Sequence, residues 1–176
     1  MNLNIPTINS MKEILILTGA CGVGKSTIAK QWAKLKQGAV IESDHFRNWI
    51  FNKIYARFSK EEEMLIAELT IVSAKEYLKH NMSVAIDNAW TPLGLDKLKN
   101  DLEKEFENVA IQFVWLKCDL EENHRRDKLR IEENQMKDRV TIVNAELSEY
   151  IWPDYITILD TTNLTERETL DLIFEN

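Results

Sequence analysis

The chain has 176 residues, enough for one domain with a full hydrophobic core, and 44% of them are hydrophobic. Its net charge is −7, from 22 basic and 29 acidic side chains, which argues against a protein that coats long nucleic acids, because phosphate affinity needs a basic field. Two cysteines are too few for a disulfide framework, so we expect a reducing, cytoplasmic setting.

The beginning of the chain lacks the basic and apolar stretches of a signal peptide, and we expect residues 1–11 to form a flexible tail. No later apolar run is long enough to cross a bilayer, so no membrane partner is expected. Residues 12–176 contain no repeat, linker or low-complexity tract. They are predicted to form one continuous domain.

The next stretch has the pattern of a phosphate-binding loop. A short apolar run at residues 13–18 predicts a buried parallel strand, and residues 27–36 predict an amphipathic helix. Between them the sequence matches G-x-x-x-x-G-K-[ST], in which Lys25 would reach the β- and γ-phosphates and the Ser26 hydroxyl would ligate Mg²⁺. The alternative, a glycine-rich turn without a ligand, is disfavoured by this strand–loop–helix context. The predicted nucleotide-binding residues here are Gly19, Ala20, Cys21, Gly22, Val23, Gly24, Lys25, Ser26 and Thr27.

Strand and helix patterns alternate along the rest of the chain, which is typical of a parallel sheet with helices on both faces. Capping boxes at Ser59 and Thr165 each predict the start of a helix. One segment differs, because residues 119–139 carry charges on every side, and we expect it to be solvent-facing and mobile. The further strands are predicted at residues 39–42, 83–87, 110–116 and 155–159, and the further helices at residues 46–58 in part, 59–79, 95–106, 140–151 and from 165 to the end.

Two aspartates follow predicted strands, where ligands of parallel α/β sheets bind. Asp44 follows the second strand and could accept the proton of an acceptor hydroxyl; its alternative role is the N-cap of the next helix. Arg47 lies one helical turn further on. Asp87 ends the third strand and could hold a Mg²⁺-bound water, or could instead be a turn aspartate bonded to its own loop.

The charged segment supplies two candidate arginines, Arg126 and Arg130. Their i, i+4 spacing would place both on one side of a helix, where they could close over the transferring phosphate as a lid. The alternative is a solvated face whose arginines pair with Glu122 or Glu133.

Aromatic residues could line an acceptor pocket. Trp90 is the preferred candidate, because its loop directly follows Asp87. The members of a second aromatic group cannot all face the core at their spacing, so some could line a pocket. For this group, packing against the helix that begins at residue 59 is favoured over a pocket role. This group comprises Phe46, Trp49, Phe51, Tyr55 and Phe58.

Taken together, these motifs resemble those of the small P-loop kinases, a group that includes shikimate and gluconate kinases, chloramphenicol phosphotransferases, zeta toxins and polynucleotide 5′-kinases. The resemblance implies a P-loop NTPase three-layer sandwich with a five-stranded parallel sheet of order 2-3-1-4-5 and a helical lid at about residues 119–139. It also implies ATP and Mg²⁺, with Thr161 and Asn163 near the adenine. The Asp44-x-x-Arg47 spacing is similar to that of polynucleotide kinases, in which the arginine grips a substrate phosphate. Shikimate is disfavoured, because residues 88–94 hold no counterpart of the substrate-binding arginines.

We therefore expect an ATP-dependent phosphotransferase that moves the γ-phosphate to a hydroxyl of a small-molecule acceptor. One alternative is a nucleotide or polynucleotide 5′-hydroxyl kinase, and another is a regulatory nucleotide-binding NTPase without an acceptor. Beside the nucleotide-binding residues, the predicted catalytic residues are Lys25, Asp44, Arg126 and Arg130, the substrate-binding residues are Asp44, Arg47 and Trp90, and the metal-binding residues are Ser26 and Asp87.

Overall fold

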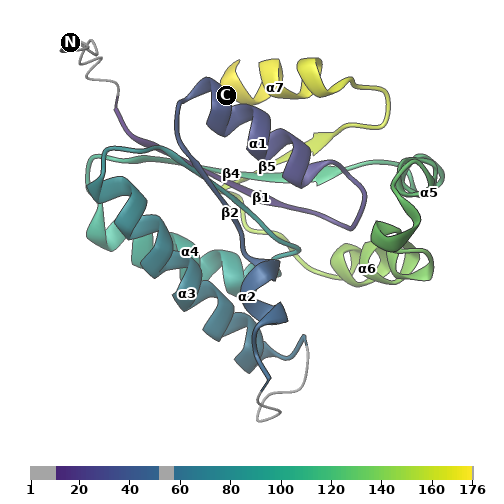
Figure 1. Ribbon diagram of the computed structural model, residues 1–176, viewed down its shortest axis with the longest axis horizontal. Coiled ribbons are helices and arrows are strands. Elements are labelled where there is room, and N and C mark those ends of the chain that lie inside the picture. Colours follow the sequence, from purple (N-terminus) through teal and green to yellow (C-terminus); the bar gives the residue numbers. More distant parts are fainter. Residues whose placement is uncertain (1–10, 52–57, 176) are drawn as a thin grey trace.

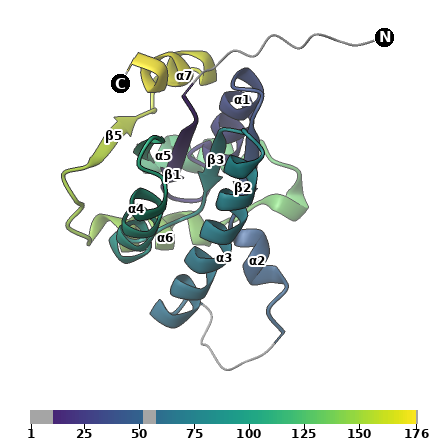
Figure 2. The same cartoon turned by 90° about the vertical axis from the view of Figure 1, so that its left-hand side faces the viewer.

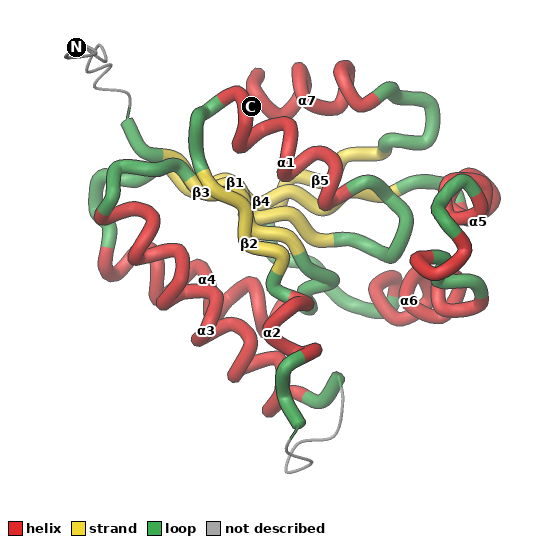
Figure 3. Tube along the Cα trace, in the orientation of Figure 1, coloured by secondary structure: helices red, strands yellow, loops and turns green. Residues whose placement is uncertain are grey.

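The computed structural model describes residues 11–51 and 58–175. Five parallel strands form a sheet of order β2-β3-β1-β4-β5, which confirms the predicted order (Figure 3). All five strands lie within two residues of their predicted positions. They are β1 (Glu13–Thr18), β2 (Ala39–Glu42), β3 (Val84–Asp87), β4 (Ala110–Lys117) and β5 (Ile156–Asp160).

Helices cover both faces of the sheet, as the three-layer prediction requires. In Figures 1 and 2, α1 (Lys25–Leu35) and α7 (Glu166–Glu175) lie on one face, and α3 (Lys60–Lys79) and α4 (Pro92–Glu105) lie on the other. The remaining elements are α2 (Asp44–Asn48), α5 (Leu120–Lys128), a 3₁₀ turn (Glu132–Asn134) and α6 (Asp138–Ser148). No helix within the described ranges is long and apolar enough to cross a membrane.

The core is centred on β1, which pairs with β3 on one side and β4 on the other. Leu15, Ile16 and Leu17 have no exposed surface, because helices also cover both faces of this strand. A central parallel strand is buried on every side, which is why its sequence is a continuous apolar run. The phosphate-loop motif therefore follows the central strand of the sheet.

The two predicted capping boxes form to different extents. At α7, the Thr165 hydroxyl accepts from the Glu168 N–H at 3.2 Å, and the Glu168 carboxylate accepts from the Thr165 N–H at 2.8 Å. At α3, the Ser59 hydroxyl accepts from the Glu62 N–H, but the Glu62 carboxylate turns to Arg47 and to the Phe58 N–H. The Glu62 carboxylate therefore does not complete the capping box, and it contacts Arg47 on α2 instead.

The predicted tail lies outside the described residues except for Met11, which is exposed. The same is true of Tyr55 in the predicted aromatic group.

Candidate active site

The carboxyl ends of the strands meet at one edge of the sheet. Asp87 at the end of β3 is in register with Leu17 on β1 and with Glu42 on β2. The phosphate loop, Asp44 and Asp87 therefore emerge next to one another, where ligands of parallel α/β sheets bind.

The loop between β1 and α1 adopts the backbone conformation that its glycines permit. Gly19, Gly22 and Gly24 all have positive φ angles, of 142°, 90° and 103°. At Gly19 a Cβ would also lie 2.3 Å from the Leu116 carbonyl oxygen on β4, so no side chain fits there. The loop is thus folded tightly against the sheet and leads directly into α1.

Lys25 is the first residue of α1, and its Nζ donates to the Ala20 carbonyl oxygen at 2.9 Å. The ammonium therefore lies across the loop rather than in solvent. It also acts electrostatically on Asp87, which places the loop cation beside the end of β3. A cation at a helix N-terminus enclosed by a loop of main-chain amides is an arrangement suited to phosphate.

Asp87 is a buried carboxylate whose charge its neighbours compensate only in part. Burial raises the pKa of Asp87, while the Lys25 ammonium and a hydrogen bond from the Ser26 hydroxyl act to lower it. The charges of Glu42 and Asp44 add to the rise. Within the described residues, Asp87 Oδ2 has no hydrogen-bond partner. In the loop that follows, Asn88 Oδ1 accepts from the Ala89 N–H at 2.8 Å.

The donor set around Asp87 fits a magnesium ion that keeps water and substrate oxygens as ligands. Asp87 Oδ2, which is buried and has no partner among residues 11–51 and 58–175, and the Ser26 hydroxyl are hard oxygen donors of the kind that Mg²⁺ prefers. In the part of the chain that the structure describes, no group of three or more His, Cys, Asp or Glu side chains could hold a metal by itself. Protein ligands alone would therefore be insufficient, as is usual for magnesium bound with a nucleotide.

Asp44 and Arg47 form an ion pair within α2 and are joined by a residue from α3. Asp44 is the first residue of α2, but its side chain is 58% exposed and accepts from Arg47 rather than capping the helix. The Arg47 side chain is only 9% exposed and also donates to Glu62 at 2.8 Å. Glu62 was not predicted as a site residue, because the sequence pattern identifies it only as the last residue of the Ser59 capping box.

Arg126 connects α5 with the loop after β5 and with the phosphate loop. Its guanidinium donates to Thr161 Oγ1 at 3.0 Å and to the Thr161 carbonyl at 2.6 Å, and more weakly to the Val23 carbonyl at 3.4 Å. It also pairs with Glu122 at 2.7 Å, as the solvated alternative predicted. Arg126 is thus brought to the loop that contains the predicted adenine-side residues, with Thr161 buried and Asn163 exposed.

Arg130 does not share a helix face with Arg126, because the helix that the i, i+4 argument requires ends before Arg130. Helix α5 ends at Lys128, because the buried Asp127 carboxylate accepts from the N–H groups of Met136 and Lys137 and folds the chain back. Instead, Arg130 Nη1 lies 3.7 Å from Asp127 Oδ1 and donates to the Asn134 carbonyl oxygen.

The segment 119–139 is not solvent-facing all round, which corrects a second expectation. Asn123 is fully buried, and its Oδ1 lies 2.4 Å from the point where a Cβ on Gly22 would stand. Neither its Oδ1 nor its Nδ2 has a partner among the described residues. Helix α5 therefore packs on the phosphate loop through a polar side chain, which a count of apolar residues does not detect.

The predicted aromatic wall does not form around Trp90. Trp90 has no exposed surface and belongs to the hydrophobic core, so its ring does not line an open acceptor pocket. The backbone of Trp90 is held beside β1, because the Thr18 hydroxyl donates to the Trp90 carbonyl at 2.8 Å. Trp49 and Phe51, by contrast, are 75% and 82% exposed just after α2. Phe46 is partly buried against the core.

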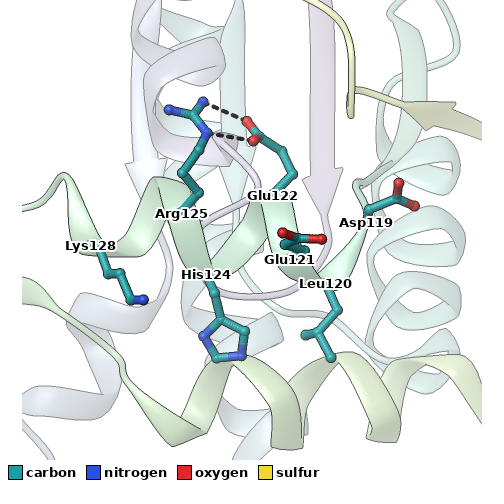
Figure 4. Close-up of a pocket in the computed structure, with 7 residues that line it drawn as sticks. All are labelled: Asp119, Leu120, Glu121, Glu122, His124, Arg125 and Lys128. Carbon is teal, nitrogen blue, oxygen red and sulfur yellow. Dashed lines mark hydrogen bonds and ion pairs between the residues drawn. The ribbon is translucent and has the colours of Figure 1, made fainter.

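A hollow of about 910 Å³ lies on the outer side of α5, and no residue of the phosphate loop lines it. Figure 4 shows Arg125 and Glu122 joined by two hydrogen bonds, with His124 and Lys128 pointing away from them. These two arginine contacts and one from Arg126 lower the pKa of Glu122 to about 2. The surface is polar and open and holds none of the predicted site residues.

An AAA domain family model matches residues 14–151, which is most of the chain. The chain belongs to this AAA domain family. The match begins in β1 and includes the phosphate loop, both strand-end aspartates and residues 119–139. Comparison with curated proteins finds no match.

Solved structures share the fold of this AAA domain over nearly the whole chain. A sugar kinase from Janibacter sp. HTCC2649 is 17% identical, with 94% of each chain covered and a TM-score of 0.71. A gluconokinase from Sinorhizobium meliloti 1021 is 15% identical, with 94% and 98% covered and a TM-score of 0.64. The APS kinase of Mycobacterium tuberculosis, solved with AMPPNP and APS, is 14% identical, with 94% and 96% covered and a TM-score of 0.64. At these identities the likeness establishes a P-loop kinase-like fold, in agreement with the resemblance found in the sequence.

Proposed function

We propose that this protein is an ATP-dependent kinase that transfers the γ-phosphoryl group to a hydroxyl of a small-molecule acceptor. The observation that carries the proposal is one arrangement at the sheet edge. Lys25 and the Ser26 hydroxyl lie beside the buried Asp87 carboxylate, and Asp44 acts on the same group from the end of the next strand. Phosphoryl transfer needs such positioning and charge neutralisation more than covalent chemistry.

The phosphate loop would hold the triphosphate. Its N–H groups and the N-terminus of α1 would bind the phosphate oxygens, with Lys25 leaving the Ala20 carbonyl for the β- and γ-phosphates. Arg126 would keep the loop after β5 against the phosphate loop, so that Thr161 and Asn163 lie near the base. Ser26 and Asp87 would hold Mg²⁺, which neutralises charge that builds up on the phosphates.

Asp44 would accept the proton of the acceptor. Its exposed carboxylate face is free of the helix backbone, so an acceptor hydroxyl can donate to it. A bond forms between the acceptor oxygen and the γ-phosphorus while the bond from that phosphorus to the bridging oxygen breaks. The hydroxyl proton passes to Asp44, and ADP leaves with the bridging oxygen. Residues 12–176 would form the kinase domain, with residues 119–139 as the lid and residues 1–11 as a tail.

The test is an acceptor panel with the full chain. ATP consumption and product phosphorylation are measured with sugars, nucleosides, aminoglycosides and amphenicols, for the wild type and for Asp44→Ala. We expect one class to raise turnover well above the slow reaction with water, and Asp44→Ala to lower that gain about a hundredfold or more. Asp154→Ala, at an exposed site, is the matched control. Turnover that no acceptor raises, with ATP bound normally, would contradict the proposal and favour a regulatory NTPase.

A 5′-hydroxyl kinase is the second candidate, and one observation favours it. The exposed Trp49 and Phe51, with ring centroids 6.5 Å apart, follow Arg47 and could stack on a nucleobase. Transfer of labelled phosphate to a 5′-hydroxyl oligonucleotide decides between the two. We expect Trp49→Ala together with Phe51→Ala to raise the KM for such a substrate and to leave the KM for ATP unchanged.

A further inference from the structure

Two arginines from different elements lie over the ring of one phenylalanine, and one of them is Arg47, the partner of Asp44. The guanidinium carbon of Arg47 on α2 lies 4.7 Å from the centroid of the Phe58 ring, and that of Arg139 on α6 lies 4.0 Å from it. Phe58 directly precedes the N-cap of α3 and has a positive φ of 64°. Cation–π contacts of this kind fix the position of a guanidinium without neutralising its charge.

The two arginines differ in charge compensation. Arg47 pairs with Asp44 on its own helix and with Glu62 on α3, and its side chain is almost buried. Two carboxylates compensate its charge and its side chain is nearly inaccessible, so it offers a ligand neither a free charge nor an open approach. Arg47 therefore fits the role of a positioning residue for Asp44 better than that of an anion clamp.

Arg139 has no such compensation. Among the described residues, no carboxylate forms an ion pair with its side chain, and its guanidinium makes a cation–π contact with the ring of Phe58. A guanidinium that lies over an aromatic ring keeps its N–H groups available, and they can bind two oxygens of a phosphate or carboxylate. The side chain is partly exposed, so a ligand can reach it.

From this contrast we propose that Arg139 binds an anionic group of the acceptor, a phosphate or a carboxylate, while Asp44 accepts a hydrogen bond from the hydroxyl of the same acceptor. The inference rests on the proposed kinase function and narrows its substrate class. Arg139 lies at the last position of the predicted lid, in the first turn of α6, and Phe58 joins it to the Asp44–Arg47 pair. A neutral acceptor would leave this preoriented cation without a partner when the site closes.

The experiment uses matched pairs of acceptors that differ in one anionic group. Glucose is compared with gluconate and with glucose 6-phosphate, and adenosine with 3′-AMP, so that the carboxylate and phosphate arms are separate. Steady-state kinetics are measured for the wild type, Arg139→Ala and Arg139→Lys. Arg125→Ala, which removes an exposed arginine of the neighbouring α5, is the matched control.

We expect the anionic member of a pair to have the higher kcat/KM. Arg139→Ala should raise its KM at least tenfold and leave kcat and the KM for ATP nearly unchanged. Arg139→Lys should recover part of the loss, because it keeps the charge but not the two-pronged geometry. Equal use of neutral and anionic acceptors, or equal effects of Arg139→Ala on both, would overturn the inference.

A binding measurement separates failure of this inference from failure of the proposed function. Protein saturated with AMPPNP, which occupies the phosphate loop, is titrated with inorganic phosphate and with gluconate by calorimetry. We expect binding to the wild type and at least tenfold weaker binding to Arg139→Ala, with unchanged thermal unfolding before ligand is added. Binding of AMPPNP without binding of either anion overturns the inference alone, whereas no binding of AMPPNP contradicts the kinase proposal itself.

Discussion

The two sides of the sheet edge are built by different means. The proposed phosphate side is made of main chain, because its loop geometry depends on glycines and on the start of α1, all within residues 19–26. The proposed acceptor side is made of side chains from α2, α3 and α6 and from Phe58, which precedes α3; its members are Arg47, Glu62, Phe58 and Arg139. A contiguous backbone motif tolerates change around it, whereas an assembly of distant side chains depends on each partner. The following predictions test this contrast, from the largest expected effect to the smallest.

Lys25→Ala should have the largest effect, because it removes the ammonium that lies across the phosphate loop beside Asp87. We expect acceptor-dependent turnover to fall by about a hundredfold to a thousandfold, as when a single charge-stabilising group is lost. ATP affinity by calorimetry and kcat are the measurements. Lys34→Ala, in the exposed last turn of the same helix, should change neither. Wild-type heat of ATP binding in Lys25→Ala would show that the loop is not a nucleotide site.

Glu62→Ala should destabilise the acceptor side. It leaves the Arg47 guanidinium nearly buried with only the exposed Asp44 as a counter-ion, and we expect the free energy of unfolding to fall by about 3 kcal/mol. Chemical denaturation measures the loss. Glu61→Ala, an exposed neighbour in the same turn of α3, should cost little. Equal values for the two variants would mean that the Arg47–Glu62 contact contributes nothing to the fold.

Gly22→Ala and Gly24→Ala compare backbone strain with a clash. Both glycines have positive φ, but only at Gly22 does a Cβ meet another atom, Asn123 Oδ1. We expect Gly24→Ala to cost about 1 kcal/mol of unfolding free energy and Gly22→Ala about 2 kcal/mol, without nucleotide. Placing both variants in an Asn123→Ala background should remove the difference between them. A difference that persists there would mean that α5 does not pack on the loop.

Asp87→Asn should have the smallest effect on stability, and that effect should depend on pH. Burial raises the pKa of Asp87 in the fold above its ordinary value of 3.8, so the charged form opposes folding once the pH exceeds that value. We expect Asp87→Asn to be more stable than the wild type by about 1 kcal/mol at pH 7, with the gain shrinking as the pH falls toward 4. Thermal unfolding across this range measures it, with Asp154→Asn as the exposed control. A gain that grows in acid would contradict the sign.

The comparison also shows what residue patterns can predict. The strand positions were predictable from residue patterns, because each strand is a short apolar run, whereas the order of the strands in the sheet came from the resemblance to small P-loop kinases. Trp90 was placed in a pocket by its neighbourhood in the sequence, yet it is fully buried. Arg130 was placed on a helix by its spacing, yet α5 ends before it. Both errors come from side-chain contacts that local spacing does not record.

The sequence by itself determined the phosphate loop, the alternation of strands and helices, and the two aspartates at strand ends. These features depend on neighbouring residues, whose main-chain geometry and apolar periodicity are local properties. Only the tertiary structure decided that Glu62 holds Arg47, that Asn123 meets Gly22, and that Arg139 reaches Phe58. These residues are far apart in the chain, and they meet because the sheet and its helices pack in one way around a shared core.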